Sequence, residues 1–298
     1  MREPVFRGAC TALVTPFNDQ GVDYDSLAKL IEFQIAGGID ALVICGTTGE
    51  ASTMTMDEHV DVVARAVRMV DGRVPVIAGA GSNDHRHAVE QSKRLEGVGA
   101  DALLSVTPYY NKTTQAGLIA HYAGIAGAVG LPIILYNVPG RTSMNIDPPT
   151  LGELSRIDNI VGVKECNTDQ LGECVNLCAP DFAFYTGEDP NVLTLLAWGG
   201  IGVISVVSNV IPGDTHGLVA KWAAGDTAGA RAAQLKMLPL IKALFCEVNP
   251  IPVKEALNIM GFGVGRPRLP LVPASPAAHD RLAAELAAYG VGAAGAAA

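Results

Sequence analysis

The segment Asn159-Ile-Val-Gly-Val-Lys-Glu-Cys166 is too apolar for a surface strand, yet it carries a lysine near its centre. A buried ammonium must be paired or give up its proton, because desolvation lowers the pKa of a lysine. A neutral amine is a nucleophile, so the segment indicates a Schiff base between Lys164 and a carbonyl substrate. On this segment alone, a lysine that snorkels from a strand end or pairs with Glu165 explains the pattern equally well.

Composition limits the classes of protein that the chain can represent. Its 298 residues are 49% hydrophobic and 17% charged, which suffices for one large core and a single domain of barrel size. Residues 1–7 lack the apolar segment of a signal peptide, and no apolar run approaches membrane-spanning length, so we expect a cytoplasmic protein. The net charge of −9 argues against nucleic-acid or membrane-surface partners. The six cysteines form no Cys-x-x-Cys pair, so we expect reduced thiols rather than disulfides or a metal site.

Short β-branched runs alternate with amphipathic helical stretches along the chain, which is typical of βα units on a parallel sheet. The predicted strands are 8–14, 41–45, 74–78, 102–106, 132–136, 160–164, 183–185 and 202–206. Eight units predict an α/β fold of the (β/α)8 TIM-barrel class, with Lys164 on the sixth strand. An open doubly wound sheet is the second choice, but no Gly-x-Gly-x-x-Gly opens the first unit.

Three further helical stretches follow the last predicted strand, at 228–245, 252–261 and 276–288. They exceed what a barrel requires, so we expect a catalytic barrel over residues 1–225 and a C-terminal helical extension over 226–298. The Ala/Gly-rich segment 290–298 has little to bury and is predicted to be frayed.

A barrel of this class works at the carboxyl ends of its strands, so the residues that end each strand are the candidates. Gly46-Thr-Thr-Gly-Glu50 offers backbone amides and hydroxyls to a small carboxylate, although a plain strand-to-helix turn is equally compatible. Tyr136-Asn-Val-Pro-Gly-Arg-Thr142 combines a phenol with a guanidinium suited to a carboxylate. Thr107-Pro-Tyr-Tyr-Asn111 carries adjacent tyrosines of the kind found at interfaces. Together these strand ends favour the Schiff-base interpretation.

These motifs resemble the dihydrodipicolinate synthase family, also called 4-hydroxy-tetrahydrodipicolinate synthase, within the N-acetylneuraminate lyase-like class I aldolases. The resemblance runs from Phe6 to about Leu271 and includes Gly162-Val-Lys-Glu165 and Gly202-Val-Ile-Ser205. It implies a lyase that condenses pyruvate with L-aspartate 4-semialdehyde in the diaminopimelate route of lysine biosynthesis. It also implies a homotetramer built as a dimer of dimers, and neither a metal nor another cofactor. The Thr47-Thr48 pair separates the chain from sialic acid lyases, which tend to show Ser-Thr.

The resemblance also assigns a role to each matching residue. Lys164 condenses with pyruvate, Tyr136 shuttles protons, and Thr47 links Tyr136 to Tyr110 of a neighbouring subunit. The remaining residues bind substrate: Thr48, Gly46 and Gly49 hold the pyruvate carboxylate, Arg141 holds that of the aldehyde, and Gly187 and Ile204 supply main-chain contacts. A phenol–hydroxyl–phenol chain can move the protons of imine formation without a metal or flavin.

Two other functions compete with this one. Another pyruvate-dependent aldolase, such as an N-acetylneuraminate or 2-keto-3-deoxy sugar acid lyase, would use the same lysine. A non-catalytic pyruvate-binding barrel is disfavoured because every catalytic residue type is present. A metal site at His85-Arg-His87 is disfavoured too, because residues two apart point to different faces of a helix.

Feedback by L-lysine is expected to be weak or absent. Lysine-inhibited members of the family bind the effector in a cleft between subunits, whose counterpart here includes His59, Asn83 and Tyr109. His87 stands where those members carry a glutamate, and Met56 where they carry a histidine. Loss of a charge-assisted contact worth about 1.5–3 kcal/mol lowers affinity by roughly ten- to a hundredfold.

Overall fold

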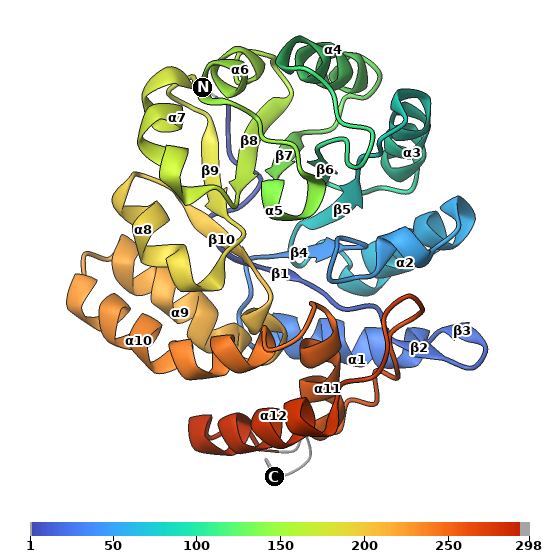
Figure 1. Cartoon of the computed structure of the whole chain (residues 1–298), viewed down its shortest axis with the longest axis vertical. Helices are drawn as coiled ribbons and strands as arrows, with labels where there is room; N and C mark the ends of the chain where they lie inside the picture. Colours follow the sequence, from blue (N-terminus) through green and yellow to red (C-terminus); the bar gives the residue numbers. More distant parts are fainter. Residues whose placement is uncertain (1, 293–298) are drawn as a thin grey trace.

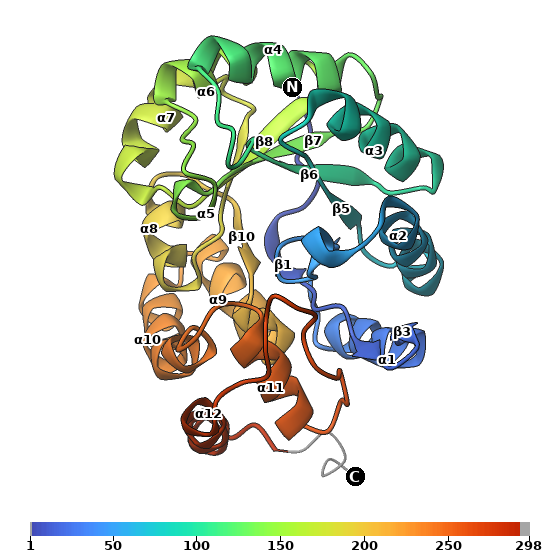
Figure 2. The ribbon, with the colours of Figure 1, turned by 45° about the vertical axis from the view of Figure 1, so that its right-hand side comes forward.

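In the computed structural model, which describes residues 2–292, eight parallel strands close into a barrel surrounded by helices (Figures 1 and 2). The barrel closes because β1 pairs with β10 on one side and with β4 on the other. The predicted (β/α)8 class is therefore confirmed. The barrel strands are β1 (Gly8–Ala12), β4 (Ala41–Ile44), β5 (Val76–Ala80), β6 (Ala102–Val106), β7 (Ile133–Asn137), β8 (Ile160–Glu165), β9 (Ala183–Thr186) and β10 (Gly202–Ser205).

Seven of the eight barrel strands differ from their predicted bounds by one or two residues at an end, and only β6 matches; two of the differences have a clear physical cause. The third barrel strand begins at Val76 rather than at residue 74, because Pro75 has no backbone N–H to donate to the ladder. The first ends at Ala12 rather than at residue 14, because the Val14 N–H donates to Asn209 Oδ1 instead of to a strand. The sixth runs one residue beyond Lys164, and Cys166 N then donates to Asn137 O.

Helices cover the outside of the barrel, and side-chain caps begin several of them: Asp23, Thr55, Asp84 and Thr114 each accept a backbone N–H. A small hairpin, β2 (Phe17–Asn18) and β3 (Gly21–Val22), was not predicted. The helices of the barrel are α1 (Tyr24–Ala36), α2 (Met56–Val70), α3 (His85–Gly97), α4 (Gln115–Ala126), α5 (Pro139–Thr142), α6 (Pro148–Leu154), α7 (Leu171–Leu177), α8 (Val192–Ala197) and α9 (Pro212–Ala223).

The core has two parts, one between the barrel and its helices and one inside the barrel. Inside the barrel, Phe6 stacks on Tyr185 with ring centroids 4.3 Å apart, and the Tyr185 hydroxyl donates to Phe6 O at 2.8 Å. Phe6 precedes β1, so this pair lies toward the amino-terminal end of the barrel. The opposite end, where the strands finish, is left for a site.

The extension consists of α10 (Thr227–Leu244), α11 (Ile251–Ile259) and α12 (Pro276–Tyr289), which lie together at one side of the barrel (Figure 2). Gly290 ends α12 in a left-handed conformation. The segment predicted to be frayed lies largely outside the described residues, because these end at residue 292. No helix in the described part of the chain is long and apolar enough to cross a membrane.

Candidate active site

Lys164 lies at the carboxyl end of β8, beside a tyrosine of the neighbouring strand. The register of β7 and β8 pairs Tyr136 with Lys164, so the two side chains emerge next to each other. The Lys164 Nζ atom is 4.3 Å from the centroid of the Tyr136 ring. Lys164 is only 6% exposed, and within residues 2–292 its Nζ makes no hydrogen bond and no ion pair. A buried amine is therefore held against a phenol with its own hydrogen-bonding capacity unused.

The charge state of Lys164 differs from the one expected from the sequence. Burial lowers the pKa of its ammonium, but Tyr136, Cys166, Cys10 and Asp189 act in the opposite direction, and the net shift of the pKa is upward. The expectation of a lowered pKa was therefore wrong for the resting site. Burial also raises the pKa of the Tyr136 phenol, although Lys164 opposes that shift. At neutral pH the pair consists of an ammonium and a neutral phenol, so the amine needs a proton acceptor before it can react.

Gly187 is the neighbour that leaves room for this lysine. A Cβ atom at Gly187 would lie 2.5 Å from Lys164 Cε and 2.5 Å from Cys166 Sγ, so a larger residue would displace both. Its N–H donates to Glu165 O at 3.2 Å. Ile204 is fully buried on β10, inside the barrel. Gly187 thus borders Lys164 directly, and Ile204 belongs to the same interior cluster as Tyr136.

The loop Gly46-Thr-Thr-Gly-Glu50 follows β4 and is tied down at several points. Thr15 Oγ1 donates to Gly49 O at 2.7 Å, and Thr48 Oγ1 accepts from Asn249 Nδ2 at 3.0 Å. Thr48 is buried, whereas Thr47 is exposed at the rim. The loop thus presents one hydroxyl inward and one outward, next to the backbone amides of its glycines.

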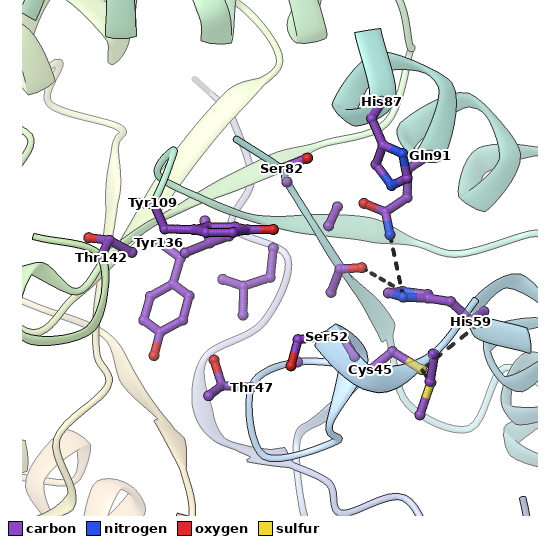
Figure 3. A pocket seen from close by; sticks show the side chains of 18 of the residues that line it. Cys45, Thr47, Ser52, His59, Ser82, His87, Gln91, Tyr109, Tyr136 and Thr142 are labelled. Carbon is purple, nitrogen blue, oxygen red and sulfur yellow. Dashed lines mark hydrogen bonds between the residues drawn. The ribbon is translucent and has the colours of Figure 1, made fainter. Parts of the chain in front are cut away.

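A cavity of about 430 Å³ opens at this end of the barrel, and we call it the mouth cavity. Gly46, Thr47, Tyr136 and Arg141 line it, and Figure 3 shows Tyr136 and Thr47 facing the same space. A hydrogen bond from Thr47 lowers the pKa of Tyr136, against the larger effect of burial. Arg141 belongs to the short helix α5 and is exposed. The cavity extends along α2 and α3 past Ser52, Met56, His59, Ser82, His87 and Gln91.

Tyr110 is not brought to this cavity within the chain. It is 90% exposed and adopts a left-handed backbone with φ of 70°, and Tyr109 lines the cavity instead. A large exposed aromatic residue beside an open site is suited to contact with another chain.

Met56, His59, His87 and Tyr109, four of the residues predicted for the effector cleft, line the mouth cavity, whereas Asn83 is not among its described lining residues. His59 is buried, its Nε2 lies 2.9 Å from Gly79 O, and its Nδ1 lies 3.3 Å from Gln91 Nε2 (Figure 3). Burial lowers the pKa of His59 to about 4, so the ring is neutral at physiological pH. No aspartate or glutamate is found among the described residues that line the cavity.

Three buried polar residues around the predicted site, Asp189, Asn249 and Lys254, were not predicted from the sequence. Asp189 is buried in the segment after β9, and its Oδ2 accepts from Val206 N and Val207 N at 3.0 and 2.9 Å. Asn249 reaches Thr48 from the extension, and Lys254 of α11 forms a buried ion pair with Glu50 at 2.8 Å. The strand-end position of Thr186-Gly-Glu-Asp189 could have indicated Asp189. The other two contacts join residues about 200 positions apart, for which one sequence carries no signal.

The fold and site define a class of protein: parallel eight-stranded barrels with a buried lysine and a phenol at the carboxyl ends of their strands, as in lyases that form a Schiff base. The sequence profile of the dihydrodipicolinate synthetase family matches residues 5–289, and the chain belongs to that family.

Individual relatives agree with this assignment. The 4-hydroxy-tetrahydrodipicolinate synthase of Acetivibrio thermocellus is 56% identical over 291 residues, which is 98% of this chain and 100% of the relative. The crystal structure of dihydrodipicolinate synthase from Thermotoga maritima superposes with a TM-score of 0.95 at 44% identity, covering 97% of this chain and 100% of that one. The crystal structure of the enzyme from Cyanidioschyzon merolae with lysine bound superposes with a TM-score of 0.94 at 38% identity, covering 97% of this chain and 100% of that one.

Proposed function

We propose that this chain is a 4-hydroxy-tetrahydrodipicolinate synthase that condenses pyruvate with L-aspartate 4-semialdehyde in the diaminopimelate route to L-lysine. The observation that carries the proposal is Lys164, buried at the end of β8 beside Tyr136 and free of hydrogen bonds within the described residues. The family and its relatives support the same reaction. The metal-free and cofactor-free chemistry that the resemblance implies is part of this proposal.

The reaction begins with loss of a proton from the Lys164 ammonium. Because the Tyr136 phenol is neutral, it takes this proton only as it gives its own to Thr47, which passes it on toward Tyr110 of the neighbouring subunit, and the neutral amine attacks the ketone carbon of pyruvate. The same relay returns a proton to the hydroxyl, which leaves as water and gives the imine, and it takes a proton from the methyl group to give the enamine that attacks the aldehyde. Tyr136 is placed for these transfers because its ring touches Lys164 and its phenol faces Thr47.

The two substrates each bring a carboxylate, and the site offers two places for them. Thr48 and the backbone from Gly46 to Gly49 bind the pyruvate carboxylate, with Gly187 and Ile204 bordering the same space. Arg141 binds the carboxylate of the semialdehyde at the entrance, because a guanidinium forms paired charge-assisted hydrogen bonds with such a group. Arg141 lines the mouth cavity and is exposed, which suits a residue that meets the second substrate.

The proposal includes a homotetramer built as a dimer of dimers, located in the cytoplasm. Tyr110 completes the proton relay of a neighbouring subunit, and its 90% exposure in the single chain leaves it available for that role. One solved relative, at 44% identity and a TM-score of 0.95, is described as a monomeric dihydrodipicolinate synthase variant. Residues 1–225 form the catalytic barrel of this assignment, and 226–298 the helical extension.

A coupled assay with pyruvate and L-aspartate 4-semialdehyde tests the reaction. The expected result is product formation that depends on both substrates and is lost when Lys164 is replaced. Turnover of N-acetylneuraminate or a 2-keto-3-deoxy sugar acid in its place would identify another aldolase. Reversible pyruvate binding without covalent capture by borohydride would identify a binding protein.

A further inference from the structure

Asn249 contacts the loop that follows β4 from the C-terminal extension. It lies between α10 and α11, is 6% exposed, and its Nδ2 donates to Thr48 Oγ1 at 3.0 Å. The two residues are 201 positions apart in the chain. The contact thus joins the extension directly to a loop at the carboxyl end of the barrel.

This hydrogen bond limits which further hydrogen bonds the Thr48 hydroxyl can form. A hydroxyl has one hydrogen to donate and two lone pairs that accept. When Asn249 Nδ2 occupies a lone pair, the hydrogen is directed elsewhere, and within residues 2–292 Thr48 Oγ1 donates to no protein group. The hydroxyl hydrogen is therefore free to be donated to a ligand, whereas one of the two lone pairs that could accept is already occupied.

We propose that Asn249 is a positioning residue that orients the Thr48 hydroxyl so that its hydrogen meets the carboxylate of pyruvate. The inference rests on the proposed function, because it assigns the anion at Thr48 to pyruvate. Asn249 acts through Thr48 and does not touch the substrate.

A second tie from the extension holds the same loop in place. Lys254 Nζ donates to Glu50 Oε1 at 2.8 Å, to Thr15 O at 3.1 Å and to Arg266 O at 3.1 Å. Glu50 Oε2 accepts from Arg268 N at 2.8 Å. Because this network fixes the backbone of the loop, the side chain of Asn249 is left to set the direction of one hydroxyl. Its own Oδ1 is buried and has no partner in the described part of the chain, so no other contact of the amide depends on it.

Reductive trapping with pyruvate and borohydride tests the inference, because it reads the first substrate alone. Asn249→Leu and Asn249→Ala should raise the half-saturating pyruvate concentration about tenfold, the size expected for a charge-assisted hydrogen bond. The trapping rate at saturation should stay within about twofold, since Lys164 and Tyr136 are untouched. Thr48→Val should give at least the same loss. Asn258→Ala is the matched control, because Asn258 Nδ2 donates to Gly265 O within the extension, and it should change nothing.

The double variant Asn249→Leu/Thr48→Val separates orientation from a general structural effect. If Asn249 acts through the hydroxyl, the double variant binds pyruvate no more weakly than Thr48→Val alone, whereas additive losses would overturn the inference. An unchanged or lowered half-saturating concentration in Asn249→Leu would overturn it too, because an amide that accepted from Thr48 would release the hydroxyl when removed. A wild-type protein that forms no pyruvyl adduct would overturn the proposed function itself, and a normal adduct with unaffected Asn249 variants would overturn this inference alone.

Discussion

Two buried lysines, one at the end of β8 and one in α11, differ in the hydrogen-bond acceptors that surround their ammonium groups. Lys164 is 6% exposed and Lys254 is 1% exposed, so burial does not distinguish them. All three N–H groups of Lys254 have acceptors, one of them the carboxylate of Glu50. Lys164 Nζ has none within the described residues and lies over the face of Tyr136 instead. In the proposed function, the number of acceptors around the nitrogen, rather than its burial, separates the structural Lys254 from the reactive Lys164.

The difference follows from the cost of burying charge. An ammonium removed from water must recover its lost hydrogen bonds, and a buried pair is stable only when its geometry satisfies both partners. Glu50 and two carbonyl oxygens do this for Lys254, where burial lowers the pKa and Glu50 opposes the shift. At Lys164 no acceptor for the three N–H groups is found among residues 2–292, which leaves them able to bond to a substrate.

The largest expected effect separates the two lysines by activity. Lys164→Arg should abolish imine trapping and lower turnover by at least about a thousandfold, because a guanidinium stays protonated and cannot act as the amine. Steady-state kinetics and mass spectrometry after reduction with pyruvate measure both effects, and circular dichroism should show an intact fold. A pyruvyl adduct of normal yield on the variant would assign the chemistry to another residue.

For the free energy of unfolding, we expect Lys254 to matter more than Lys164. Lys254→Met leaves Glu50 buried without its cation and should lower the free energy of unfolding by about 3–5 kcal/mol. Lys164→Met, the matched control, removes a buried ammonium that has no anion bonded to it and should cost less than about 1 kcal/mol. Urea unfolding of both variants provides the comparison. Equal losses would mean that both lysines are structural, and the distinction between the two regions would fail.

The pH dependence of imine formation sharpens the account of Lys164. Its pKa is raised above that of an ordinary lysine, so below that pKa the neutral fraction grows as pH rises. The rate of imine formation should therefore increase continuously through neutral pH, by up to about tenfold per pH unit. Rapid quenching, followed by reduction at one fixed pH, measures it.

A control is needed for Glu165, whose carboxyl has a pKa raised to about 7 by burial. Glu165→Gln should leave the rise of rate with pH in place, because the slope belongs to Lys164. A plateau beginning near pH 7 in both proteins would indicate that the pKa of Lys164 is lowered after all.

The smallest expected effect is that of free L-lysine, whose ammonium would enter the mouth cavity from solution. The part of the mouth cavity beside Met56 and His87 has no carboxylate among its described lining residues, so an effector ammonium would lack the partner that Glu50 gives Lys254. We expect little or no inhibition by lysine at near-saturating aspartate semialdehyde. Half-inhibition below about 1 mM, equivalent to more than about 4 kcal/mol of binding, would show that other groups satisfy the effector.

Much of the fold could be predicted, because strand and helix periodicities are local. The repeated βα pattern placed Lys164 on the sixth barrel strand, and only strand ends such as the one at Pro75 moved. The charge state of Lys164 could not be predicted, because it depends on groups from β1, β7 and the segment after β9 that meet only in the folded barrel. Lys254 was likewise missed, since its partner Glu50 is 204 positions away.

Peptide mapping after borohydride reduction with pyruvate tests the central claim most directly. One experiment then compares the amount of pyruvyl adduct on all lysines of the intact protein. The account predicts a pyruvyl adduct on the peptide that contains Lys164 and no adduct on the peptide that contains Lys254. An adduct distributed over exposed lysines, or absent from Lys164, would contradict it.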